Sequence, residues 1–112
     1  MQYRIFQYRL FIDDERWPTT PDWIIARTPL QAIQAFENYG MPYEIAFDHD
    51  LGVSSDGTKM EVMEFVNYLW HLAEEGKLIF PSDFKYSIHS QNPIGAENIR
   101  SKMDQLIRYY SE

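Results

Sequence analysis

The sequence predicts an α/β fold built on a small parallel sheet of about four strands. Short apolar runs end abruptly in polar side chains, at 10–12, 45–47 and 86–88, which is typical of buried parallel strands. Helical patterns alternate with strand patterns after the second strand, which favours parallel crossovers with helices on the sheet. The chain has 112 residues, of which 45% are hydrophobic and 16% aromatic. This is enough for the core of a single domain, residues 1–112.

Strands are expected over 3–12, 23–26, 44–47 and 84–88, because these stretches are rich in β-branched, aromatic and aliphatic residues. The stretch 16–21 is expected to be a loop, because two prolines and two threonines interrupt any period. The stretch 51–57 contains glycines, serines and an aspartate, and it predicts a second loop.

The first helix is expected to begin after Thr28, an N-cap residue that Pro29 follows, and to end at Gly40. For the second helix, Thr58 and Glu61 predict a capping box at the start, and Gly76 predicts the end. The apolar faces of the first two helices are expected to hold Leu30, Ile33 and Phe36, and Val62, Phe65, Val66, Leu69 and Ala73. The last helix is expected to start at Asn92-Pro93 and to bury Ile99, Met103, Leu106 and Tyr110.

The totals exclude several classes of protein. The net charge of −7 argues against a duplex nucleic-acid platform, because affinity for duplexes depends on cationic contacts to phosphates. The absence of cysteine excludes disulfides, thiolate catalysis and thiolate-bound zinc. No signal peptide or membrane-spanning stretch is expected, so a cytoplasmic protein without a membrane partner is predicted. The aromatic content leaves room for an exposed patch and a homodimer.

Carboxylates at the ends of two predicted strands suggest a metal site. Asp13 and Asp14 follow the first strand, and Asp48 and Asp50 follow the strand 44–47. Parallel strands deliver such residues to one edge of the sheet, where like charges repel unless a cation or shared protons offset them. Oxygen ligands suit Mg²⁺ or Mn²⁺, which Asp13, Asp14 and Asp48 are expected to bind. The alternative is that the Asp13-Asp14 pair is solvated loop.

His89, Ser90 and Asn92 follow the strand 84–88 and complete the candidate site. Histidine is suited to proton transfer near neutral pH, while the serine hydroxyl and the asparagine amide can hold phosphoryl oxygens. A helix that begins after this turn also attracts anions. The alternative is that His89 is a packed histidine and Asn92 only a helix cap.

Further residues have two readings each. Arg16 and Arg27 can grip a phosphate or pair with the surplus acids. Trp17 can stack on a nucleobase or belong to the core. His49 lies between two aspartates, so strand alternation favours packing over direct chemistry. His71 is expected to lie on the surface of the second helix.

The order of these motifs resembles the receiver domain of two-component signalling. The resemblance rests on the acidic pair after the first strand and on Asp48, which stands where receivers carry the phosphoacceptor. Asp56-Gly57 and Ser90 also have counterparts in that family. The implied fold is a three-layer, flavodoxin-like sheet. The first receiver helix and the last strand are expected to be reduced or missing, and no lysine stands where receivers place one to grip the phosphate.

The chain also resembles the cyclic-phosphate-processing receiver family of bacteria and phages, over roughly residues 9–105. This similarity is carried by residues 10–16, Trp23, Arg27-Thr28, 47–52 (Phe-Asp-His-Asp-Leu-Gly) and 89–98 (His-Ser-Gln-Asn-Pro-Ile-Gly-Ala-Glu-Asn). It implies the handling of cyclic phosphates of nucleotides or RNA ends. Asn98 joins the phosphate-binding candidates as part of the last string.

Three functions are compatible with these features. The first is a metal-assisted phosphodiesterase, a hydrolase acting on a cyclic nucleotide or a cyclic-phosphate RNA end, with His89, Asp48 and Asp14 as catalytic residues and Ser90, Asn92, Arg16 and Arg27 on the phosphate. The second is a module that sequesters a cyclic nucleotide without cleaving it, as a phage protein that blunts host defence would do. The third is a phosphoacceptor switch at Asp48, which the missing lysine disfavours.

Overall fold

A computed structural model gives the architecture of the chain. It describes residues 7–13, 16–47, 50–53, 59–61, 63–89 and 93–110, and for 50–53 and 59–61 it describes the backbone alone. Of the predicted site residues, Asp14, Asp48, His49, Ser90 and Asn92 lie outside this part. The side chain of Asp50 lies outside it as well.

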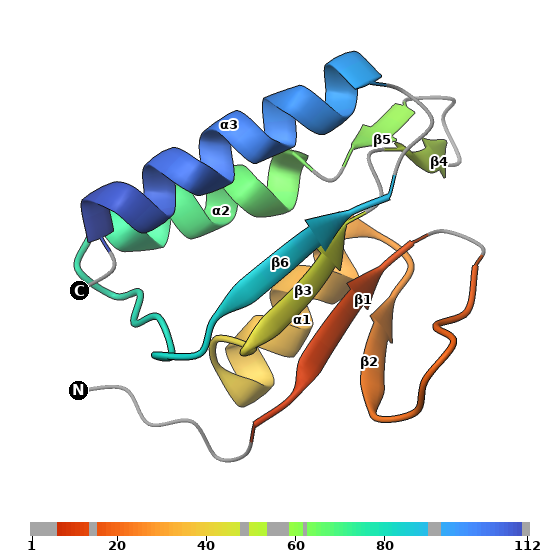
Figure 1. Cartoon of the computed structure of the whole chain (residues 1–112), viewed down its shortest axis with the longest axis horizontal. Coiled ribbons are helices and arrows are strands. Elements are labelled where there is room, and N and C mark those ends of the chain that lie inside the picture. The colour runs from red at the N-terminus through yellow and green to blue at the C-terminus, as the bar shows by residue number, and fades with distance from the viewer. Residues whose placement is uncertain are drawn as a thin grey trace.

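Six strands and three helices make up the described chain (Figure 1). The strands are β1 (Arg9–Ile12), β2 (Trp23–Ala26), β3 (Glu44–Phe47), β4 (Asp50–Val53), β5 (Lys59–Glu61) and β6 (Lys85–Ile88). The helices are α1 (Pro29–Tyr39), α2 (Met63–Glu74) and α3 (Pro93–Tyr110).

The central sheet has four parallel strands in the order β2-β1-β3-β6. The α/β class and the four-stranded parallel sheet predicted from the sequence are therefore confirmed. All four strands run the same way, so their carboxyl ends meet at one edge, which we call the carboxyl edge.

All three helices lie on one face of this sheet. Side chains of alternate strand positions on that face pack with residues of the three helices in one core. The strand residues of this core are Leu10, Ile12, Ile24, Ala26, Ile45, Phe47, Tyr86 and Ile88. The helices also touch one another in the order α1, α2, α3, so they form a continuous layer (Figure 1).

The opposite face of the sheet, which we call the helix-free face, carries no described helix. The reason lies in the connections. Right-handed crossovers that move in opposite directions along a sheet run over opposite faces. The step from β1 to β2 moves one way, and the later steps to β3 and β6 move the other way. The first step uses only residues 13–22, which is shorter than the dozen or more residues of a usual helical crossover. The expected loss of a helix at this point accounts for the helix-free face.

Helix α1 begins and ends where the sequence predicts. The Thr28 side chain accepts a hydrogen bond from the Gln31 N–H at 3.1 Å, and Gly40 ends the helix with a φ of 85°, a left-handed angle that favours glycine. Leu30 was expected on the apolar face, which is wrong, because it is 61% exposed. Successive steps of three residues drift around a helix, so Leu30 stands about 120° from Phe36.

Three expectations about the elements need correction. The expected loop 51–57 overlaps β4, which pairs antiparallel with β5 beyond the carboxyl edge (Figure 1). Helix α2 begins at Met63, and Glu61 belongs to β5, so the expected capping box is wrong. The first strand begins at Arg9, because Gln7 and Tyr8 lie outside it, and the last strand begins at Lys85 rather than at 84.

Helix α3 is the longest described helix, with 18 residues. It buries Ile99, Met103 and Leu106 as predicted. Tyr110 is 37% exposed and packs edge-to-face on Trp70. None of the helices in the described ranges is both long and apolar enough to cross a bilayer.

Candidate functional site

Asp13 and His89 each stand one residue beyond a strand of the central sheet. The Asp13 N–H donates to the Ala26 carbonyl oxygen at 3.1 Å, and the His89 N–H donates to the Phe47 carbonyl oxygen at 2.8 Å. These bonds extend the pairing of β1 with β2 and of β6 with β3 by one residue, so both residues are fixed at the carboxyl edge. Strand alternation directs both side chains to the helix-free face.

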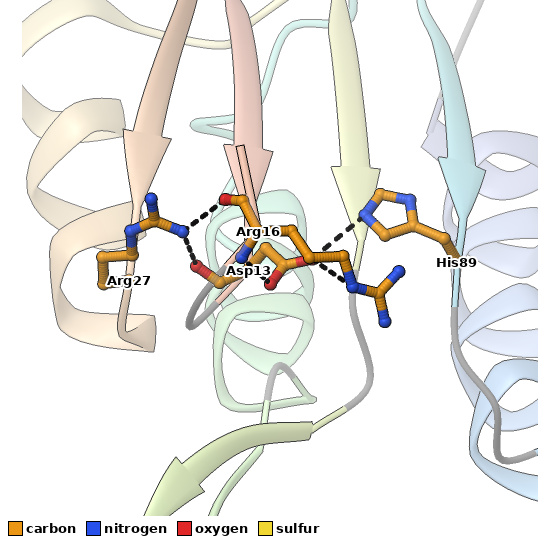
Figure 2. Close-up of polar contacts among 4 residues, drawn as sticks. All are labelled: Asp13, Arg16, Arg27 and His89. Atoms are coloured by element: carbon orange, nitrogen blue, oxygen red, sulfur yellow. Dashed lines mark hydrogen bonds and ion pairs between the residues drawn. The ribbon is translucent and has the colours of Figure 1, made fainter. Parts of the chain in front are cut away.

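The two side chains meet across the end of β3. Asp13 Oδ2 lies 3.5 Å from His89 Nε2 (Figure 2). Asp13 is fully buried, whereas 29% of the His89 side chain is exposed. The predicted convergence of positions 13 and 89 is therefore observed. The imidazole reaches solvent, and the carboxylate lies behind it.

Phe11 of β1 supports the imidazole from across β3. Its ring stacks on His89 with centroids 5.3 Å apart and planes 24° apart. Ala46 of the intervening β3 pairs with Phe11 in register and is small enough to leave room for both rings. No role in the site is predicted for Phe11 from the sequence. The available signal was its position two residues before Asp13, which places both on one face.

Arg16 binds the same carboxylate as His89. Its backbone N–H donates to Asp13 Oδ1 at 3.0 Å, and its Nε lies 3.5 Å from Asp13 Oδ2. The first contact holds the Arg16 backbone against Asp13, directly after β1. The Arg16 side chain is about half exposed, so its guanidinium can contact an anion beside His89.

Arg27 fixes the loop that carries Arg16. Its Nη1 donates to the carbonyl oxygens of Asp13 at 2.9 Å and of Arg16 at 2.6 Å (Figure 2). The guanidinium also lies over the Trp17 ring, 4.8 Å from its centroid. Nη1 of Arg27 therefore binds the protein backbone. The predicted contact of Arg27 with phosphate stays a prediction for the other guanidinium nitrogens.

Burial lowers the pKa of His89 below its ordinary value. The Asp13 carboxylate raises this pKa and the Arg16 guanidinium lowers it, but burial has the largest effect. The lowered pKa favours the neutral imidazole, which can accept a proton. A carboxylate can only accept hydrogen bonds, so Asp13 favours the tautomer with hydrogen on Nε2.

The predicted metal site is represented in the described residues by Asp13 alone. Among the described residues, no group of three His, Cys, Asp or Glu side chains could hold a metal ion. The carboxylate of Asp13 suits Mg²⁺ or Mn²⁺ chemically, but it already contacts Arg16 and His89. The described residues do not by themselves fit a divalent ion, and the roles of Asp14 and Asp48 stay predictions.

The remaining predicted residues in the described part of the chain are Asn98, Asp50 and His71, and no contact with this cluster is described for them. Asn98 is exposed on α3, and its role on phosphate stays a prediction. The backbone of Asp50 begins β4, opposite Glu61. His71 lies on the surface as predicted, where it pairs with Glu75 at 3.2 Å.

Comparison with known proteins identifies the family. The model of the cyclic-phosphate processing receiver domain matches residues 8–105, a range that contains Asp13, Arg16, Arg27 and His89. No curated protein and no solved structure matches the chain. Because the match covers most of its length, the chain belongs to the family of cyclic-phosphate processing receiver domains.

Proposed function

We propose that this domain is a phosphodiesterase that hydrolyses a cyclic phosphate, on a nucleotide or at an RNA end, with His89 as the general base. The observation that carries the proposal is the pairing of a half-buried histidine, whose pKa is lowered, with a fully buried carboxylate at the carboxyl edge. The family is associated with cyclic-phosphate processing, and ligands of open α/β sheets bind at this edge.

The reaction needs one proton acceptor that later becomes a donor. Neutral His89 takes a proton from a water molecule as the water oxygen bonds to phosphorus. The ring P–O bond then breaks, and the proton on His89 passes to the leaving oxygen, which gives a phosphate monoester. Asp13 orients the imidazole and stabilises the imidazolium formed in between. General acid–base catalysis of this kind contributes typically about 10²- to 10⁴-fold.

Arg16 is the proposed phosphate ligand. Negative charge on the phosphoryl oxygens grows as water attacks, and a guanidinium beside His89 offsets that charge. The bonds from Asp13 and Arg27 hold the Arg16 backbone in place before the ligand arrives. Preorganised charge of this kind lowers the barrier because it costs no rearrangement during the reaction.

A divalent ion is a separate proposal, in which Asp14 and Asp48 join Asp13 as ligands. Such an ion supplies charge that polarises a phosphoryl oxygen. The steps assigned to His89, Asp13 and Arg16 do not pass through it.

Turnover of a panel of cyclic phosphates tests the proposal. Purified protein, with and without Mg²⁺ or Mn²⁺, is expected to convert at least one mononucleotide or oligonucleotide cyclic phosphate to a monoester, followed by ³¹P NMR. His89→Gln is expected to slow the reaction at least about 100-fold, while His71→Gln on the exposed face of α2 keeps the wild-type rate. Tight binding with the ligand recovered intact would instead indicate a sequestering module and contradict the hydrolase.

A further inference from the structure

Trp17 is a large aromatic side chain held outward beside the candidate site. It follows Arg16 directly in the chain and is 74% exposed. Leaving so much indole surface in water is costly, since about 25 cal/mol is gained for each Å² of apolar surface that is buried. Other apolar side chains are as exposed, and what sets Trp17 apart is its position beside the proposed phosphate ligand Arg16.

Arg27 holds this ring in position. Its guanidinium covers one side of the indole at 4.8 Å from the centroid, and its Nη1 is fixed by the carbonyl oxygens of Asp13 and Arg16. The Arg27 backbone N–H is itself fixed, because it donates to Gln31 Oε1 at 2.6 Å. The Arg27 guanidinium therefore connects the Trp17 indole to the backbone of Asp13, whose carboxylate faces His89.

We propose that the solvent-facing side of Trp17 is a stacking subsite for the nucleobase attached to the cyclic phosphate. This inference rests on the proposed function, because Arg16 must hold the phosphate for the base to reach Trp17. Stacking on an aromatic ring is tolerant of base identity. The subsite therefore selects ligands that carry a base without selecting one base.

The arginine behind the ring strengthens this assignment. A cation over one face of an indole is attracted by the ring electrons and favours this position of the ring. The base then meets a ring that is already ordered, so less conformational entropy is lost on binding. Arg27 and Trp17 together form the subsite, with the guanidinium on one side and the base on the other.

Binding of three probes tests the subsite. The probes are glycerol cyclic phosphate, which has no base, adenosine 2′,3′-cyclic phosphate, and a short RNA that ends in the same cyclic phosphate. Calorimetry uses His89→Gln protein so that no probe is consumed. Trp17→Ala is expected to weaken binding of a base-carrying probe about 5- to 150-fold, as for loss of one base–aromatic stack, and to leave glycerol cyclic phosphate unchanged. Trp17→Phe is expected to restore most of the loss.

Tyr109→Ala is the matched control, because Tyr109 is an exposed aromatic residue on α3 that is 63% exposed. It is expected to change no affinity. A loss with both base-carrying probes assigns the subsite to nucleotides in general, and a loss with the RNA alone assigns it to RNA ends. Equal weakening of all three probes, or no weakening of any, would overturn the subsite.

The proposed function is judged separately by the base-free probe. Glycerol cyclic phosphate is expected to bind and to lose affinity in Arg16→Gln. If it does so while Trp17→Ala changes nothing, only the subsite is rejected. If no probe binds, or if Arg16→Gln has no effect, the phosphate site itself is rejected, and the subsite with it.

Discussion

Asp13 is the only charged side chain that is buried among the described residues. A buried carboxylate is costly unless hydrogen bonds and opposite charges compensate. Here the Arg16 backbone N–H, the Arg16 guanidinium and the His89 ring all face it. Burial of this carboxylate therefore lowers the stability of the fold, and it keeps a negative charge behind an imidazole that reaches solvent.

The opposite influences of Asp13 and Arg16 on His89 give a test at the residue scale. Asp13 raises the pKa of His89 and Arg16 lowers it, while burial holds it below the ordinary value. Asp13→Asn is therefore expected to lower the pKa further, and Arg16→Gln is expected to raise it. NMR titration of the imidazole signals measures both, with His49→Gln and His71→Gln used to assign the three histidines. Shifts of both variants in the same direction would contradict the geometry of the cluster.

At the scale of elements, several side chains hold the loop between β1 and β2. Arg9 and Trp23 bind its last residues, and Arg27 holds the part that carries Arg16 and Trp17. Arg27 reaches from the end of β2 to the carbonyl oxygens of Asp13 and Arg16 and covers Trp17. The planar guanidinium contacts two backbone oxygens and an aromatic ring at once. The ammonium group of a lysine cannot reproduce this set of contacts. The position of Arg16 and Trp17 thus depends on the strand beside them.

Arg27→Lys tests this dependence. We expect the free energy of unfolding to fall by about 1–2 kcal/mol, because hydrogen bonds from a charged donor are lost. Urea denaturation followed by circular dichroism measures the change as a lower midpoint with an unchanged slope. Arg108→Lys, on the exposed last turn of α3, is the control and is expected to leave the midpoint alone. An unchanged midpoint in Arg27→Lys would show that the loop is held by other contacts.

The elements also show what a sequence can predict. Thr28 and Gly40 were predicted as helix ends correctly, because caps depend on a few neighbouring residues. The pairing of β4 with β5 was missed, because glycine and serine near these strands were interpreted as a loop. Asp56-Gly57 was the available hairpin signal. Contacts between distant segments, such as Phe11 on His89, needed the sheet order, which local patterns do not contain.

At the scale of the whole molecule, one short crossover explains how the helices are distributed over the sheet. No helix is described between β1 and β2, and the described helices lie on the face opposite to Asp13 and His89. The meeting of these two residues was predicted from the rule that parallel strands share a carboxyl edge. Their distance and the burial of Asp13 followed only from packing.

The divalent ion is tested on the whole chain, because its predicted ligands come from two separate strand ends. Mn²⁺ is expected to broaden the amide NMR signals of Asp13 and its neighbours, since carboxylate oxygens bind this ion. Asp48→Asn is expected to remove the broadening, while Asn98→Ala, which leaves all three carboxylates, keeps it. The absence of broadening in the wild-type protein would contradict the proposed ion site. The chemistry proposed for His89 would not be affected.

The most direct test of the central claim is the pH dependence of kcat/KM for the best cyclic phosphate substrate, set beside the NMR titration of His89. Because its pKa is lowered, His89 keeps its proton-accepting form until the pH falls below the ordinary histidine value. The account predicts that kcat/KM falls about tenfold for each pH unit below the pKa that NMR assigns to His89. A rate that stays constant across that pKa would contradict a catalytic role for this imidazole.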